Sequence, residues 1–222
     1  MAWRRWHPDL WTLDHPFVAG GLHLGIRATA VRDAEGVALI SAVPMDEAER
    51  ADLAQLGPVT AIVAPNLLHW MYAGAALSHF PKARLLGPEA LRAKAPELPW
   101  SPLDPAEPRW RALHAAPLNG LPKMTETTLF HEPSRTLIAA DLAFNVVHSD
   151  SWWTRTFMAV NGAYGHFGPS QIFRSMLKDP PALRKSLDAL IALGPERIIV
   201  AHGEVLEQGG TETLQQAYTW VR

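Results

Sequence analysis

The strongest constraint on the fold is a strand-length apolar run followed by a helical segment, a pattern that then repeats. Residues 60–64 are almost wholly apolar, and a predicted helix at about 67–80 follows. The next predicted strand is 84–87, with a short helix at 89–95. A continuous apolar run of this length is typical of a central strand that is covered on both faces. This β-α-β-α alternation predicts an α/β layered fold.

Further strands and helices flank this unit on both sides. The other predicted strands lie at residues 10–13, 27–32, 37–41, 127–131, 136–140 and 197–201. The other predicted helices lie at 46–56, 182–193 and 211–221. The first of them has the clearest start signal, because Asp46 is followed three residues later by Glu49, which is the capping-box spacing.

Two stretches lack a regular pattern. Residues 96–122 contain seven prolines, including Pro105 and Pro108, and we interpret them as a connecting loop with one short strand at 110–113. Residues 145–180 are interrupted by three glycines, and the glycine-rich part at 162–168 is typical of a flexible loop that can close over a site.

Composition limits the classes of protein to consider. The 222 residues are 48% hydrophobic and 19% charged, which predicts one globular domain spanning residues 1–222. The formal net charge of −2 gives no strong attraction to nucleic acid or to an anionic membrane, so we expect a small-molecule ligand as partner. The oligomeric state is not predicted.

The absence of cysteine excludes disulfides, thiolate metal sites and a cysteine nucleophile, and it fits a reducing compartment. No secretory signal or membrane-spanning run is evident, so we expect a soluble cytoplasmic protein. The sequence also contains no Gly-x-Ser-x-Gly elbow and no phosphate-binding glycine loop after a strand. These absences argue against a serine hydrolase and a nucleotide-binding enzyme.

Three chemically useful side chains follow apolar strands or stand where a strand passes into a helix. They are His69, Asp141 and His202, and Asn66 belongs to the same group. In α/β sheets, sites form outside the carboxyl ends of strands, where separate connections converge. Two imidazoles and a carboxylate are suitable ligands for zinc or iron. The hypothesis therefore requires residues 69, 141 and 202 to share one crevice.

Three segments resemble the metallo-β-lactamase-like hydrolases. Residues 62–69 with 80–88 resemble their first metal loop, 133–142 resemble the strand that ends in the metal-bridging aspartate, and 198–203 resemble the closing histidine-glycine turn. The resemblance spans about residues 10–220 and is closest to an uncharacterised branch of that superfamily. It implies a four-layer αββα sandwich.

The departures from that family predict a degenerate metal site. The resemblance places four ligand positions of the family's first metal loop at Asn66, Leu68, Trp70 and Met71, none of which is a strong zinc ligand, while His69 is one residue out of step. The loop that carries the family's third histidine corresponds to residues 121–126, where Glu126 is the only substitute. Asp141 and His202 alone match residue by residue.

Two hypotheses follow. In the first, His69, Asp141 and His202, with Glu126, hold one zinc or iron ion for hydrolysis of an ester, lactone or phosphoester. Asp141 and His202 are then the catalytic candidates, and Asn66 orients the substrate or water. In the second, the protein binds no metal, Asp141 and His202 hydrogen-bond one another, and the cleft binds a small molecule or a protein partner without catalysis.

Overall fold

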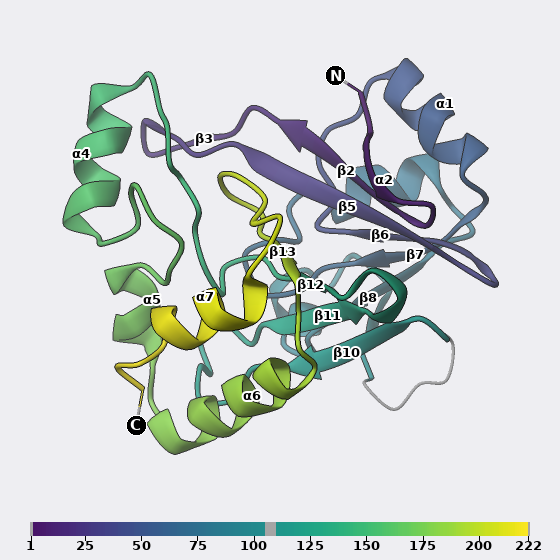
Figure 1. Cartoon of the computed structure of the whole chain (residues 1–222). Helices are drawn as coiled ribbons and strands as arrows, with labels where there is room; N and C mark the ends of the chain where they lie inside the picture. The colour runs from purple at the N-terminus through teal and green to yellow at the C-terminus, as the bar shows by residue number, and fades with distance from the viewer. Residues whose placement is uncertain (1, 105–109, 222) are drawn as a thin grey trace.

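Two β-sheets dominate the structure, a computed structural model that describes residues 2–104 and 110–221. The seven-stranded sheet has the order β1 (Arg4–His7), β2 (Leu10–His15), β5 (Ile26–Asp33), β6 (Gly36–Ile40), β7 (Val59–Val63), β8 (Arg84–Gly87) and β9 (Trp100–Pro102). The four-stranded sheet has the order β10 (Leu113–Pro117), β11 (Thr127–His131), β12 (Thr136–Ile138) and β13 (Arg197–Ile199). A separate hairpin pairs β3 (Val18–Ala19) with β4 (Leu22–His23) and extends toward α4 (Figure 1).

Helices cover the outer side of each sheet (Figure 1). With the larger sheet lie α1 (Glu47–Gln55), α2 (Ala73–His79) and α3 (Leu91–Lys94). With the smaller sheet lie α5 (Gln171–Met176), α6 (Pro180–Ala192) and α7 (Gly210–Ala217), while α4 (Trp152–Val160) packs against the β3–β4 hairpin. None of the helices in the described residues has the length and apolarity to cross a bilayer.

Three of the four apolar clusters in the described residues divide the sheets and their covering helices into four layers. One core lies between α1, α2 and the larger sheet and includes Leu53 and Ile62. A second lies between the two sheets and includes Val63 of β7 and Ile138 of β12. The third lies between the smaller sheet and α5, α6 and α7. Because neighbouring residues of β7 belong to different cores, this strand is covered on both faces, as its apolar run predicts. The predicted α/β class and αββα sandwich are confirmed.

The predicted helix at 67–80 is too long at its start. In the structure α2 begins at Ala73, and residues 67–72 form turns. The physical reason is a side chain, since Asn66 Oδ1 accepts hydrogen bonds from the backbone N–H groups of Leu68 and His69, each at 2.8 Å. Such local bonds compete with helical ones. The terminal helix likewise ends at Ala217, earlier than predicted.

Two other predictions need correction. The strand expected at 110–113 is β10, which begins only at Leu113 and pairs with all five residues of β11; Pro105 and Pro108 lie outside the described residues. The stretch at 145–180 contains two helices, α4 and α5, capped by the side chains of Ser151 and Ser170. They are short, at nine and six residues, so hydrophobic periodicity gives little signal.

His131 makes the fold sensitive to acid. This histidine of β11 is fully buried, and its Nδ1 lies 2.7 Å from Ser134 Oγ, as expected for a hydrogen-bonded core residue. Burial and then the neighbouring His7 lower its pKa to about 4, although Asp9 and Asp33 partly oppose them. Between pH 6.5 and 4 the unfolded chain therefore binds the proton more readily. The stability that His131 contributes is fully present above pH 6.5 and is lost toward pH 4.

We expect His131→Gln to reduce this acid sensitivity. Between pH 7 and pH 4 the wild type should lose on the order of 2–3 kcal/mol more of its unfolding free energy than the variant does. Urea denaturation at both pH values measures the difference. Parallel losses in the two proteins would show that His131 is not the group responsible.

Candidate metal centre

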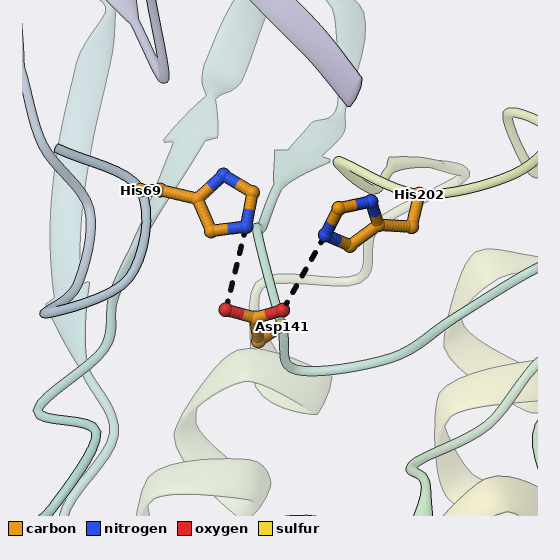
Figure 2. Close-up of side chains that lie close together, drawn as sticks. All are labelled: His69, Asp141 and His202. Carbon is orange, nitrogen blue, oxygen red and sulfur yellow. Dashed lines mark ion pairs between the residues drawn. The ribbon is translucent and has the colours of Figure 1, made fainter. Parts of the chain in front are cut away.

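The three predicted side chains come together at one edge of the sandwich. His69 lies in the turns between β7 and α2, Asp141 follows β12, and His202 follows β13. One ligand atom from each of the three lies within 4.8 Å of the others, and Figure 2 shows both imidazoles pointing at the Asp141 carboxylate. The three residues are only 8%, 7% and 5% exposed. The convergence that the sequence hypothesis requires is therefore confirmed.

The spacing of these atoms argues against a direct hydrogen bond between Asp141 and His202. His202 Nε2 lies 3.7 Å from Asp141 Oδ1, beyond hydrogen-bond distance, and His69 Nε2 lies 3.4 Å from Asp141 Oδ2. The direct hydrogen bond that the metal-free hypothesis expects between Asp141 and His202 is absent from this geometry, in which the two side chains lie at ion-pair distance. Each imidazole instead faces a separate oxygen of the carboxylate.

The outer nitrogen of each imidazole is held by the protein. His202 Nδ1 lies 2.7 Å from the backbone oxygen of Gly25. A carbonyl only accepts, so Nδ1 carries the proton, and in neutral His202 the Nε2 lone pair faces Asp141. His69 Nδ1 lies 2.8 Å from Ser41 Oγ. Metal-binding histidines are commonly oriented by such bonds from the second ring nitrogen.

Asn66 orients the Asp141 carboxylate through a side-chain hydrogen bond. Its side-chain amide donates to Asp141 Oδ2 at 2.8 Å, while its oxygen accepts the two N–H bonds of the following turn. The residue is 0% exposed. Asn66 therefore has no surface with which to contact a substrate in this conformation, in contrast to the substrate-orienting role that we expected from the sequence. It is a positioning residue.

Glu126 lies next to the cluster and does not join it. Its two carboxylate oxygens accept from the backbone N–H groups of Ala140 at 2.8 Å and Asp141 at 2.9 Å. In the described residues the ligand group comprises only His69, Asp141 and His202. Because Glu126 is engaged with the backbone that carries Asp141, the expectation that it is a further ligand needs correction. Burial and then the nearby Asp141 raise the Glu126 pKa to about 7.

Buried charges determine which of these groups is ionised. Burial by itself would raise the pKa of Asp141, but His69, His202 and the Asn66 amide outweigh it and lower this pKa to about 2. Burial and then His69 lower the His202 pKa to about 4. Burial also tends to lower the His69 pKa, yet the Asp141 and Glu126 carboxylates raise it on balance. At neutral pH the site therefore presents a carboxylate and a neutral His202.

Solved structures provide the comparison for this architecture. A metallo-β-lactamase from Pontibacter korlensis superimposes with a TM-score of 0.62 at 12% identity, covering 96% of this chain and 98% of that one. The metallo-β-lactamase FIM-1 from Pseudomonas aeruginosa, in its mono-zinc form, gives 0.63 at 12% identity over 97% and 93% of the two chains. The chain has the metallo-β-lactamase fold. The chemotaxis sensor ODP, in a peroxy diiron form, is also similar, with 0.64 at 14% identity over 99% and 93%.

Comparison of sequences finds no relative, although comparison of structures does. No protein-family model matches the sequence, and a search of the curated proteins finds no match either. This agrees with a divergent branch of the metallo-β-lactamase fold, as the altered first metal loop predicts.

Several residues that support this site in the metallo-β-lactamase fold were not identified by the sequence analysis. Ser41 directly follows β6, so the rule that identified His69 and Asp141 could have found it. Phe144 stacks on the His202 ring with centroids 5.2 Å apart and planes 7° apart. Arg27, which is 7% exposed, donates to the backbone oxygen of Val200 at 2.8 Å. Gly25 acts through its backbone oxygen, for which side-chain chemistry gives no signal.

Proposed function

We propose that this protein is a hydrolase that uses a single divalent metal ion, held by His69, Asp141 and His202. One observation carries the proposal. Two imidazole Nε2 atoms face separate oxygens of one buried carboxylate, and their outer nitrogens contact Ser41 Oγ and the Gly25 carbonyl. Without a cation, the neutral His202 lone pair would face the negatively charged Asp141, which is unfavourable in a buried site.

The spacing of the donor atoms supports the same conclusion. Ligand atoms about 2.0–2.2 Å from a tetrahedral zinc ion lie roughly 3.3–3.6 Å apart. His69 Nε2 lies 3.4 Å from Asp141 Oδ2 and His202 Nε2 lies 3.7 Å from Asp141 Oδ1, and one ligand atom from each of the three residues lies within 4.8 Å of the others. Zinc and iron both accept nitrogen and carboxylate ligands, and the similar structures include a mono-zinc and a diiron protein. Three protein ligands also leave a position for water or substrate.

The chemistry expected is hydrolysis of an ester, a lactone or a phosphoester. A metal ion bound there would lower the pKa of a coordinated water and polarise the scissile group. The chain's own residues fix the ligands: Asn66 and Glu126 orient Asp141, and Gly25 holds the His202 tautomer. The alternative is a metal-free protein that binds a small molecule or a protein partner without catalysis.

Metal content tests the proposal directly. Untagged wild-type protein, equilibrated with zinc or with iron(II) and then desalted, should hold about one equivalent by elemental analysis. Asp141→Ala with His202→Ala should hold almost none, because only one of three ligands remains. The matched control is His148→Ala with Asp150→Ala, which removes the same residue types from an exposed pair with a 3.2 Å separation. This control should retain the metal.

Unfolding and activity complete the experiment. Circular dichroism and thermal unfolding show whether the double variant is folded, and Asp141→Asn provides a milder substitution. A panel of p-nitrophenyl esters, aryl lactones and bis-p-nitrophenyl phosphate then tests the loaded wild type for turnover. Trace metal that is the same in the wild type and in a folded double variant would overturn the metal-dependent function and favour the metal-free alternative.

A further inference from the structure

A cavity lies away from the metal ligands, beside α5 and α7. Its volume is about 520 Å³, and its walls come from residues 166–169, from Arg174 of α5 and, in and after α7, from Thr213, Gln216, Ala217, Thr219 and Trp220. A cavity of this size can hold a small metabolite. The β12 and β13 loops that carry Asp141 and His202 contribute none of its lining residues.

Arg174 is the distinctive residue of this cavity. Its guanidinium carbon lies 4.8 Å from the centroid of the Trp220 ring, so the indole supports the cation from one side. Its Nε is buried and has no hydrogen-bond partner in the part of the chain that the structure describes. Across residues 2–104 and 110–221 no ion pair of Arg174 with an aspartate or glutamate is found. An arginine that is held in place by an aromatic ring and has no acidic partner in the described residues is suited to binding an anion.

The other lining residues fit the same ligand. No aspartate or glutamate is present among the described residues that line the cavity. Thr213, Gln216 and Thr219 provide neutral polar groups on α7 and just after it. A positive, hydrogen-bonding cavity without carboxylates matches an oxyanion, for which guanidinium forms paired bonds.

We propose that this cavity is a binding site for a small phosphate monoester, with Arg174 as the main anion-binding group. The site is distinct from the metal centre, although the two share a support. Residue 168 forms two backbone hydrogen bonds with Phe144, at 2.9 and 3.0 Å, and Phe144 stacks on His202. The proposal does not depend on metal binding or on hydrolysis.

Isothermal titration calorimetry tests the site. Metal-free protein is titrated with phenyl phosphate and, separately, with inorganic phosphate. Wild type should bind both, and phenol, which lacks the anion, should not bind. Arg174→Gln should weaken binding by about tenfold or more, since the paired charge-assisted bonds are lost. The matched control Arg5→Gln removes an exposed arginine of β1 in the other sheet and should change affinity less than about twofold.

Two further variants make the outcome decisive. Asp141→Ala with His202→Ala should retain phosphate affinity, because the metal centre is not involved. Arg174→Lys keeps the charge and should bind more weakly than wild type but better than Arg174→Gln. Thermal unfolding confirms that each variant is folded. No binding by wild type at 10 mM of the probes (about 100-fold above a 0.1 mM Kd), or unchanged affinity in folded Arg174→Gln, would overturn the proposal.

Discussion

Gly203→Ala is expected to remove at least about 3 kcal/mol of the free energy of unfolding and to weaken metal binding. Gly203 has a φ of +88°, and an added Cβ would lie 2.2 Å from the Asn145 backbone oxygen and 2.6 Å from the Val146 nitrogen. Backbone atoms cannot turn aside as a flexible side chain can. The segment that contains Gly203 and the segment at Asn145 and Val146 must therefore separate. The bond from the Asn145 N–H to the His202 oxygen, now 3.1 Å, lies at that junction, so His202 would move with it.

A second glycine variant separates the two causes of destabilisation in Gly203→Ala, which are the left-handed backbone and the close contacts of the added Cβ. Gly165 has a similar φ of +79°, but an added Cβ there would meet no atom within 4 Å. Gly165→Ala should therefore cost only about 1 kcal/mol, the price of a left-handed backbone for a residue with a Cβ. Chemical denaturation of the metal-free proteins measures the free energy of unfolding of both variants. A zinc titration measures the metal affinity, which should fall if His202 moves. Equal losses in the two variants would show that the close approach at Gly203 is unimportant.

Glu126→Leu is expected to have a similarly large effect, at about 4 kcal/mol of destabilisation, because two buried backbone N–H groups lose their acceptors. Those groups belong to Ala140 and Asp141, so the backbone that carries the central carboxylate of the metal centre would lose its support. Glu126 is itself only 1% exposed. Metal affinity should fall even though no ligand has been removed.

Glu126→Gln and Glu132→Gln complete this comparison. The glutamine at position 126 keeps one acceptor and should therefore fall between wild type and Glu126→Leu in both stability and metal affinity. Glu132 is exposed and pairs with His114 at 3.1 Å, so its replacement should cost less than about 1 kcal/mol. Chemical denaturation and zinc titration measure the series. A Glu126→Leu protein with wild-type stability and metal affinity would exclude a positioning role for Glu126.

Much of the architecture could be predicted from local pattern. The capping box of Asp46 and Glu49 is present as expected, and α1 ends just before the predicted stop. The apolar run at 60–64 is a strand covered on both faces, and His69, Asp141 and His202 converge. The errors arose where one side chain outweighed a pattern, as Asn66 does at the start of α2, or where an element was too short to show a period, as in α5.

The sequence alone determined the alternation of strands and helices at residues 60–95 and the identity of three metal-ligand candidates, because periodicity, caps and strand-end positions are local properties of the chain. Only the tertiary structure decided the roles of Asn66 and Glu126, because the partner of a buried amide or carboxylate depends on residues that are distant in sequence. The Asn66 amide donates to carboxylates 60 and 75 positions away. The Glu126 carboxylate accepts from backbone N–H groups 14 and 15 positions away. The same applies to the Gly25 carbonyl, which meets His202 from 177 residues away and fixes which of its nitrogens is free to bind.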